Sequence, residues 1–534
     1  MGSFARPAFF WAGAAACTAG ALLHLPMYLH ARHMGYRMAG MPVDTPMLTG
    51  MLLIVTGVAA VVHGLLPRRS GALRRQVASV RVRAVDDAPL RPAHVALLAV
   101  LSLAVTIDVM KPMTLSFVVP GVAKEYGLAS PLNPGGDVPV SWLPLSGIAG
   151  TMTGSFLWGW LGDRIGRRGS ILLAGVLFAT TSVCGAMPGF SWNVVMCFLM
   201  GTAAGGLIPI AFTLLVETVP QRHRGWLMVL IGGNVTVAYI LTSWLAATLT
   251  PTYSWRILWL VGLPTGLLLI ALNHWIPESP RYLLATGRTE EARRVLARYG
   301  STVRDAVRPA DEREAERGPA RSGYRGLFAA SFRGPTLALT VLAVGAGLMS
   351  YGFQMWLPTN LGRLGITEVS SDRVLRDSAL ISLPLNVLTA LLYGLWSSRR
   401  TVIALAALTA AALVALAVLA ETTAGHGLTL RLLLLVPLWG ISATAAVLAA
   451  YSSEAYPTPL RALGTSWAAG TSKAGGVAIL ALSVAAVAVP PLGVTALLGA
   501  VPLALAAVAF ALYGPETRGR RLDEIVTEQV PARA

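Results

Sequence analysis

Charged residues are scarce in this sequence, and that scarcity is the first constraint on its fold. Asp, Glu, Lys and Arg make up 13% of the 534 residues, whereas a soluble chain carries about a quarter. Hydrophobic residues make up 55% and are grouped in runs of roughly 20, the length that crosses a bilayer as a helix. A soluble globular fold is therefore excluded, and we expect an all-α, multi-pass membrane protein.

Cysteine is also rare, and the usual catalytic patterns are missing. Cys17, Cys184 and Cys197 all fall within apolar runs, so neither a disulfide framework nor a cysteine metal motif follows from them. The sequence shows no phosphate-binding loop, no paired cysteine ligands and no Ser-His-Asp grouping in a suitable context. We therefore expect neither an enzyme nor a bound cofactor.

The net charge of +17 invites a nucleic-acid-binding interpretation, but the placement of the arginines argues against it. Most of them fall in segments assigned to one side of the membrane, chiefly 67–91 and 277–333, which is the positive-inside bias of membrane proteins. Arginine outnumbers lysine 39 to 3, which with abundant alanine suggests a GC-rich bacterial genome. We expect the bilayer as partner, no nucleic acid, and a bacterial cytoplasmic membrane with both chain ends inside.

Fourteen membrane spans are predicted, and they fall into three groups. They lie near 8–29 and 47–66; near 93–119, 142–161, 169–187, 192–216, 226–249 and 255–276; and near 335–359, 378–397, 400–420, 430–451, 465–489 and 491–513. The expected organisation is an N-terminal two-helix hairpin with a basic linker (1–92), a six-helix half (93–276), a charged cytoplasmic loop with short helices (277–334), a second six-helix half (335–513) and a tail (514–534). A cleaved signal peptide is the alternative for 1–29, but no small-x-small cleavage site is evident.

Three short motifs recur at nearly one spacing. Glu217-Thr-Val-Pro-Gln-Arg-His-Arg224 returns as Glu454-Ala-Tyr-Pro-Thr-Pro-Leu-Arg461, and Pro277-Glu278 returns as Pro515-Glu516, offsets of 237 and 238. Gly159–Arg168 has a degenerate counterpart at Gly394–Arg400, at an offset of 235. In this second copy Ser397 or Ser398 stands where an Asp would be expected. Repeated halves of this kind build many secondary transporters, with the solute site between the halves.

These motifs resemble those of the major facilitator superfamily over about 93–525. Gly159–Arg168 resembles its loop between helices 2 and 3, and the Glu217, Pro277 and Pro515 motifs are similar to marks of its sugar-porter and organic-ion branches. Tyr351–Thr359 and Tyr456–Gly464 look more like the organic-acid and organic-ion carriers. The resemblance implies a twelve-helix alternating-access core, and it leaves residues 1–92 unexplained.

Departures from the family patterns narrow the expected substrate. Cys197 stands where sugar porters carry an arginine, and Met349–Gln354 replaces their Gln-Gln-Ser-Gly run, so a sugar is disfavoured. The span 226–249 lacks the Gly-Pro motif of drug antiporters, which weakens a drug-export reading.

Charges in the repeated loops are candidates for gating. Charge-assisted bonds there would hold the cytoplasmic side closed and then release it. The expected gating residues are Asp163, Arg164, Arg167, Arg168, Glu217, Arg224, Glu454 and Arg461. The alternative is that they are ordinary interfacial charges, each exposed pair contributing under about 1 kcal/mol.

Charges inside the spans are few and are functional candidates by default. Asp108 and Lys111 lie one helical turn apart in one span, and Lys473 lies within another. Aspartate and lysine can change protonation, which suits proton coupling or capture of an anion. An internal Asp108–Lys111 pair that only neutralises itself is the alternative.

Polar residues within spans complete the candidate site. Asn234, Gln354, Trp356 and Asn386 could line a solute cavity, and each could equally hold helices together.

The N-terminal hairpin is rich in methionine and histidine. Weak candidates for a soft metal such as copper are His30, His33, Met34 and Met38. Methionines that merely pack a short loop are the alternative, and no metal is assigned.

Together these observations predict a secondary active transporter for a small organic solute, expected to be a carboxylate, coupled to protons. Asp108 would carry the proton, and Lys111 and Lys473 would attract the anion. The alternatives are an exporter of drugs or natural products, and a non-transporting solute sensor with a carrier fold. The solute, the direction of transport and the oligomeric state are not determined by the sequence.

Overall fold

The computed structural model describes residues 6–66, 89–130, 133–300, 319–366, 368–423, 427–456, 458–485 and 490–518. Within these ranges the regular secondary structure is helical. The only β-type pairing there is two isolated bridges, Ala129 with Pro139 and Ser130 with Asn133. Three side chains expected to act in gating, those of Asp163, Arg224 and Arg461, lie outside the described part. The prediction of an all-helical membrane protein is confirmed, because twelve of the described helices are long and apolar enough to cross a bilayer.

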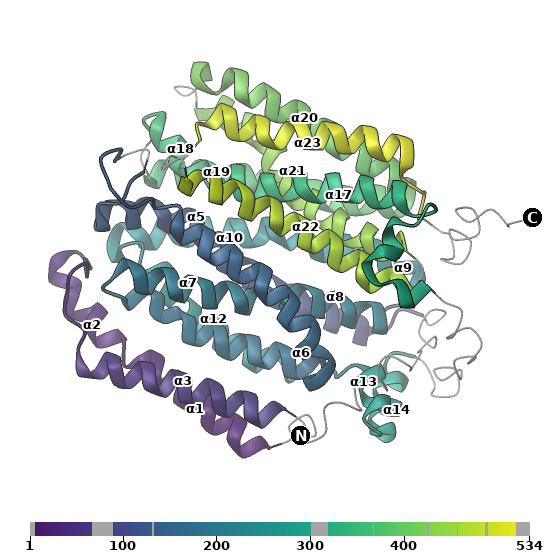
Figure 1. Cartoon of the computed structure of the whole chain (residues 1–534), viewed down its shortest axis with the longest axis horizontal. Helices are drawn as coiled ribbons and strands as arrows, with labels where there is room; N and C mark the ends of the chain where they lie inside the picture. Colours follow the sequence, from purple (N-terminus) through teal and green to yellow (C-terminus); the bar gives the residue numbers. More distant parts are fainter. Residues whose placement is uncertain are drawn as a thin grey trace, which may run out of the picture. The chain divides into compact units, whose positions relative to one another are not determined.

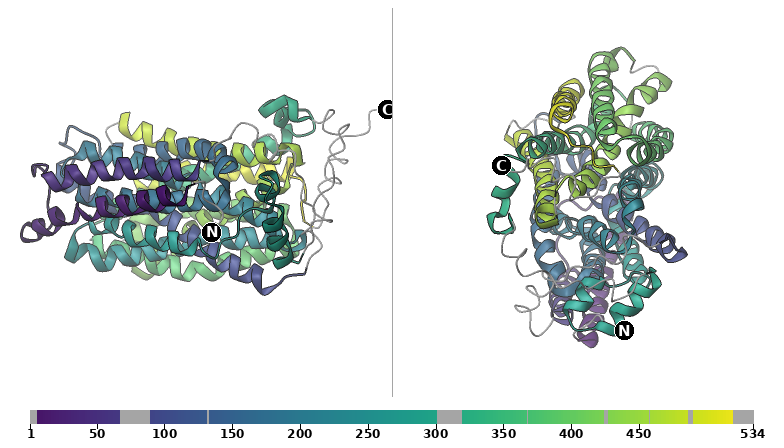
Figure 2. Two further views of the ribbon diagram at one scale, coloured as in Figure 1. Left: turned by 90° about the horizontal axis from the view of Figure 1, so that it is seen from below. Right: turned by 90° about the vertical axis from the view of Figure 1, so that its right-hand side faces the viewer.

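The N-terminal part of the described chain contains four helical segments, and the first and last of them pack closely together. They are α1 (Pro7–Leu22), α2 (Leu25–His30), η1 (Ala31–Met34) and α3 (Thr45–Leu65). Helix α3 begins where it does because the Asp44 carboxylate accepts a hydrogen bond from the Met47 amide at 2.9 Å. Both directions of view show α1 and α3 side by side (Figures 1 and 2). Their backbones approach closely at Gly20, where a Cβ would lie 2.6 Å from the Gly50 carbonyl oxygen.

The next stretch of the described chain contains eleven helical segments. They are α5 (Pro92–Tyr126), α6 (Trp142–Thr181), η2 (Ser182–Ala186), α7 (Phe190–Ala204), α8 (Leu207–Thr218), α9 (Gln221–Gly232), α10 (Asn234–Tyr253), α11 (Ile257–Leu260), α12 (Gly262–Leu272) and α13 (Pro280–Ala285), followed by α14 (Thr289–Arg298). Helix α5 continues about two turns beyond the predicted end at residue 119 and stops at Gly127, whose left-handed backbone (φ 63°) ends the helix.

The remaining chain contains the second group of helices. They are η3 (Pro319–Phe328), α17 (Arg333–Gly347), the π-helical turns η4 (Leu348–Gln354), α18 (Leu357–Arg363), α19 (Glu368–Leu391), the π-helical turn η5 (Leu392–Trp396), α20 (Ser398–Thr423), α21 (Gly427–Glu454), α22 (Thr458–Ala485) and α23 (Leu492–Tyr513). The π-helical geometry is uncommon and often occurs at functional sites.

Two compact units account for the described residues. Unit 1 comprises Met1–Leu128, Trp142–Gln221 and Leu245–Ala310, and unit 2 comprises Ala129–Ser141, Arg222–Trp244 and Asp311–Ala534. The division passes through α10, whose first half belongs to unit 2.

The number of spans differs from the predicted fourteen. The two N-terminal helical stretches are among the twelve. The predicted span 142–161 coincides with the first part of α6, and 255–276 coincides with a shorter apolar helix, Ile257–Leu272. Fourteen spans therefore stay a prediction.

Candidate functional site

Unit 1 contains a buried acid and a buried base on one face of α5. The side chains of Asp108 and Lys111 belong to residues that are only 2% and 6% exposed. The Lys111 ammonium lies 5.4 Å from the centre of the Phe178 ring of α6. It also lies against Gly262 of α12, where any Cβ would collide with it. Burying such groups is expensive, so their presence here points to a role beyond packing.

Unit 2 contains a cluster of buried polar atoms at the junction of η4 and α18. Among the described residues, Gln354 Oε1, Trp356 Nε1 and Thr359 Oγ1 have no hydrogen-bond partner. Gln354 is 2% exposed and Trp356 is fully buried. Most buried polar groups in proteins are paired, so these three atoms are available to a bound solute or to water. Gln354 and Trp356 were predicted from the sequence, whereas Thr359 was not.

Lys473 lies on α22, which packs closely against the same segment. A Cβ at Gly476 of α22 would collide with the Tyr351 ring of η4, so the two helices meet with almost no space between them. Lys473 is half-buried. The predicted Asn234, 9% exposed at the start of α10, also belongs to unit 2.

Asn386 is held in a closed ring of three hydrogen bonds. Its amide nitrogen donates to Thr236 Oγ1 at 2.8 Å, Thr236 donates to Ser442 Oγ at 2.6 Å, and Ser442 donates to the Asn386 amide oxygen at 2.9 Å. All three side chains are buried, and they come from α19, α10 and α21. The ring favours a packing role for Asn386 over solute binding. Sequence reasoning missed Thr236 and Ser442, because serine and threonine are common in membrane helices.

The first repeated loop is organised by a carboxylate at a helix N-terminus. Glu278 Oε1 accepts hydrogen bonds from the amides of Arg167 at 2.7 Å, Arg168 at 3.3 Å and Ser279 at 3.0 Å. Gly166 interrupts α6 with φ 83°, and a Cβ there would collide with the carboxylate. The negative charge of Glu278 therefore lies at the N-terminus of the second part of α6, where the helix dipole and the free amides favour an anion. We call Gly166, Arg167, Arg168, Glu278 and Ser279 the Glu278 cluster.

Arginines of the same loop bind main-chain carbonyls. Arg167 Nη1 donates to Gly162 O at 2.7 Å and Arg168 Nε donates to Asn273 O at 3.2 Å, while the Tyr282 hydroxyl donates to Arg164 O at 3.1 Å. The Ser279 hydroxyl donates to Glu217. The described residues that are predicted to act in gating are thereby connected around α13. They are Arg164, Arg167, Arg168 and Glu217.

The second repeated loop has the same architecture with different donors. Glu516 accepts from the Ser397 hydroxyl and from the Ser398 amide and hydroxyl at 2.9 and 2.5 Å. The Thr517 hydroxyl donates to Glu454 at 2.8 Å, as Ser279 does to Glu217 in unit 1. We call Ser397, Ser398, Glu454, Glu516 and Thr517 the Glu516 cluster. Glu278 and Glu516 were missed as site residues, although the repeated Pro-Glu pair was the signal that could have found them.

The two clusters also correct the predicted alignment of the loops. Ser398 donates its amide to Glu516 as Arg167 does to Glu278, and Arg399 Nε donates to Phe510 O at 3.2 Å as Arg168 does to Asn273 O. The helix starts are therefore 231 residues apart, not 235. Ser397 consequently occupies the place of Gly166, and the expectation that Ser397 or Ser398 replaces Asp163 is wrong. The motif at Gly394–Arg400 shares too few residues with Gly159–Arg168 to determine the register from the sequence.

The weak metal candidates are placed differently from one another. Met38 is fully buried in an apolar cluster, whereas His30, His33 and Met34 are exposed. Over the described ranges, no three His, Cys, Asp or Glu residues are placed to hold a metal ion. The packing interpretation of the methionines fits this arrangement.

Comparison with known proteins identifies the family. Residues 117–528 match the family model described as sugar (and other) transporter. The niacin transporter NiaP of Acinetobacter baylyi (strain ATCC 33305 / BD413 / ADP1) is 25% identical over 468 residues, which cover 83% of this chain and 99% of that protein.

A second relative and a solved structure agree with this match. The 4-hydroxybenzoate transporter PcaK of the same organism is 26% identical over 404 residues, covering 74% of this chain and 85% of that protein. The fold matches the major facilitator superfamily proton:xylose symporter XylE with a TM-score of 0.64 at 19% identity, covering 82% of this chain and 99% of that one. The chain is therefore a multi-pass membrane transporter that belongs to the sugar (and other) transporter family of the major facilitator superfamily.

Proposed function

We propose that this protein is a secondary active transporter that carries a small organic anion, coupled to protons, by alternating access across a bacterial cytoplasmic membrane. The protein would have fourteen spans and both termini in the cytoplasm. The observation that supports the anion most directly is the placement of lysine. Lys111 and Lys473 lie well inside membrane helices, whereas the third lysine, Lys124, lies in the last turn of α5 and is exposed. Inside a membrane a cation is costly and faces a pathway or a partner.

The substrate class is supported by the relatives. Two of them are named for niacin and 4-hydroxybenzoate, and both compounds are aromatic monocarboxylates. Lys473 would attract the carboxylate, and Gln354 Oε1 and Trp356 Nε1 would bind polar groups of the solute with the hydrogen bonds they lack within the described chain. Trp356 would also offer a flat apolar surface for an aromatic ring.

Proton coupling is assigned to Asp108, with Lys111 one turn away. A carboxyl group changes charge when it binds a proton, and a neighbouring lysine makes that change depend on the solute's own negative charge. The Glu278 and Glu516 clusters would act in gating, because each fixes the start of a helix through one carboxylate. Asn234 is a further candidate for solute contact.

The decisive experiment is proton flux in liposomes. The purified protein would be reconstituted with a trapped pH dye, and niacin, 4-hydroxybenzoate, xylose and a cationic drug would be added in turn. Solute-dependent acidification of the lumen with the two carboxylates alone is expected. Folded protein that moves protons with none of these compounds contradicts the proposal and favours the sensor alternative, and flux with the drug alone favours the exporter.

Variants separate the proposed roles. Asp108→Asn is expected to abolish proton-coupled uptake and to leave exchange of labelled for unlabelled solute intact. Lys473→Met is expected to raise the KM for the carboxylate at least about tenfold, since a charge-assisted bond of about 1.5–3 kcal/mol is lost. The matched control is Lys124→Met, because Lys124 is the third lysine and is exposed. Equal KM values in the two lysine variants would refute the role of Lys473.

A further inference from the structure

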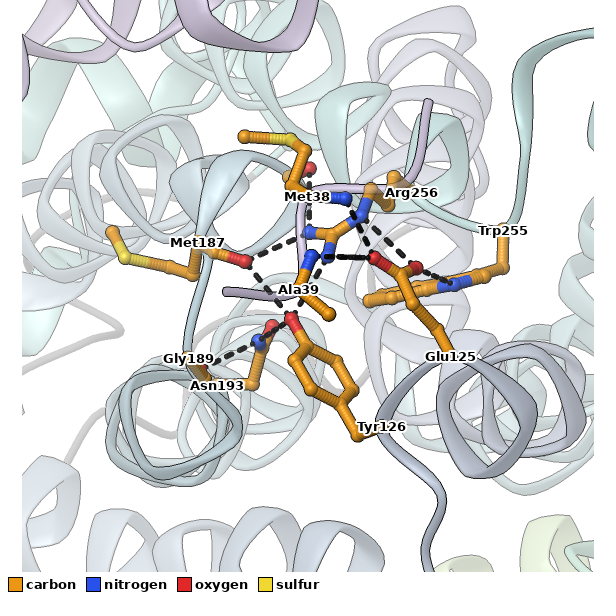
Figure 3. A network of polar contacts seen from close by, with 10 residues as sticks. Met38, Ala39, Glu125, Tyr126, Met187, Gly189, Asn193, Trp255 and Arg256 are labelled. Carbon is orange, nitrogen blue, oxygen red and sulfur yellow. Dashed lines mark hydrogen bonds and ion pairs between the residues drawn. The ribbon is translucent and has the colours of Figure 1, made fainter. Parts of the chain in front are cut away.

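The N-terminal helices contact the rest of unit 1 at a buried ion pair of that unit. Arg256, at the start of α11, is fully buried, and its Nη2 lies 2.7 Å from Glu125 Oε1 near the end of α5. Figure 3 shows the loop that carries Met38 and Ala39 lying directly against this pair. We call residues 6–65, from the first described residue to the end of α3, the N-terminal segment.

The Glu125 carboxylate is completely coordinated, and the N-terminal segment supplies two of its donors. Oε1 accepts from the Met38 amide at 2.8 Å and the Ala39 amide at 3.1 Å, besides Arg256. Oε2 accepts from Trp255 Nε1 at 2.9 Å and from Arg256 Nε at 3.3 Å. Two successive backbone amides that point at one carboxylate form an anion-binding nest. Here the N-terminal segment builds that nest for a side chain in the rest of unit 1.

Arg256 connects the same point to one further element of unit 1 and to a second residue of α5. It donates to Met187 O at 2.8 Å, after η2, and to the Tyr126 hydroxyl at 2.8 Å, on α5. Its guanidinium also lies 4.5 Å from the centre of the Trp255 ring. The ends of three helices therefore meet at one cation, whose charge is balanced by Glu125.

Apolar contacts surround this polar centre. The Tyr28 and Tyr36 rings stack at 4.7 Å, and the Tyr28 hydroxyl donates to Tyr253 O at 2.7 Å. Met38 packs with Met187 in one buried cluster that joins the segment to unit 1. These contacts exclude water from the ion pair, and a buried charge that loses a partner is strongly destabilised.

We propose that the N-terminal segment is a built-in accessory module that docks on the rest of unit 1 through the Glu125 carboxylate and stays docked as part of that unit. The segment lies outside the family match at 117–528, and both halves of the sequence repeat lie C-terminal to it, so neither explains it. Docking explains why the segment is present, because it supplies the two amides that bind Glu125 and the apolar side chains that cover the Glu125–Arg256 pair. This inference does not depend on which solute is carried.

The first test follows amide exchange in the full-length protein in mild detergent. Hydrogen exchange of a peptide covering residues 35–44 would be compared between the wild type and Glu125→Gln, which keeps the shape and removes the charge. Exchange at least about tenfold faster in the variant is expected, as for loss of bonds to a charged acceptor. Peptides of α7 should not change. Unchanged exchange at 35–44 would overturn the proposal.

A second test uses the backbone donor, in case Glu125→Gln perturbs the whole fold. A specific protease site would be placed between Ser70 and Gly71, and the purified full-length protein would be cut. Ala39→Pro removes one amide donor, whereas the matched control Ala39→Gly keeps it, and residue 39 is exposed. The fragment should stay bound in the wild type and the glycine variant and leave at least about tenfold faster in the proline variant. Equal release from all three proteins would refute docking through this turn.

Discussion

Two clusters each fix the start of a helix with one carboxylate, but the hydrogen-bond donors differ. They are the Glu278 cluster of unit 1 and the Glu516 cluster of unit 2. In both, a carboxylate after the last helix of a repeat holds the start of an earlier helix. In unit 1 all three donors reach Oε1 and come from the backbone, and among the described residues the buried Oε2 has no donor. In unit 2 hydroxyls reach both oxygens of Glu516.

This difference changes the charge preference of the two acids. Burial raises the pKa of Glu278 above its ordinary value of 4.5, and the three amides and the Arg167 charge offset only part of the rise. Burial also raises the pKa of Glu516, but the hydrogen bonds from Ser397, Ser398 and Arg518 outweigh it, and its pKa falls below 4.5. Unit 1 thus holds a carboxylate that is easier to neutralise, and unit 2 holds one that stays ionised.

The largest difference is expected from backbone geometry. Gly166→Ala would place a Cβ at φ 83° against the Glu278 carboxylate and should destabilise the protein by about 3 kcal/mol. Ser397→Ala, at the equivalent place with extended backbone (φ −165°), should cost only about 1–2 kcal/mol through lost hydrogen bonds. Unfolding in a detergent–SDS titration measures both values, and a Gly166→Ala variant as stable as the wild type would show that the two helix starts are not distinguished by geometry.

The next effect comes from the acids themselves. Glu516→Gln should cost about 1–2 kcal/mol at neutral pH, because a well-paired negative charge is lost. Glu278→Gln should cost less than about half of that, because the neutral amide avoids burying a charge. The same SDS titration compares the two variants. A larger loss for Glu278→Gln would reverse the assignment of charge preference.

A smaller effect tests the corrected register. Arg168 and Arg399 make the same Nε contact with a main-chain carbonyl, so Arg168→Lys and Arg399→Lys should each cost about 1 kcal/mol. If the loops were instead aligned by the offset of 235, these arginines would not be equivalent. Thermal midpoints in detergent that differ strongly between the two variants would count against the register.

The smallest effect is the pH dependence, and its sign differs between the acids. Because the folded pKa of Glu516 is lowered, its stabilising contribution is present above pH 4.5 and is lost as pH falls through the folded pKa. Because the folded pKa of Glu278 is raised, its contribution is present below pH 4.5 and is lost as pH rises through the folded pKa. Relative to the Gln variants, the wild type should lose stability at Glu516 as pH falls below 4.5 and at Glu278 as pH rises above 4.5, so unfolding is measured over a range that extends to both sides of that value.

Much of the fold could be predicted because its causes are local. Runs of apolar residues require helices wherever lipid is the solvent, and the repeated Glu217/Glu454 and Pro277/Pro515 motifs predicted two similar halves. Candidate residues such as Gln354 and Trp356 were found because a polar group in an apolar span is conspicuous. Asn386 was found for the same reason, but its hydrogen bonds to Thr236 and Ser442 depend on which helices are neighbours.

The sequence by itself determined the membrane class, most of the helices, the internal repeat and the family. Each of these depends on the length of apolar runs or on residues that are identical between motifs. Only the tertiary structure decided that Gly166 corresponds to Ser397, that Glu278 and Glu516 hold helix starts, and that Met38 and Ala39 reach Glu125. The physical reason is that hydrogen bonds and buried ion pairs act over about 3 Å. Residues 86 to 131 positions apart in the chain satisfy that distance only after the helices have packed.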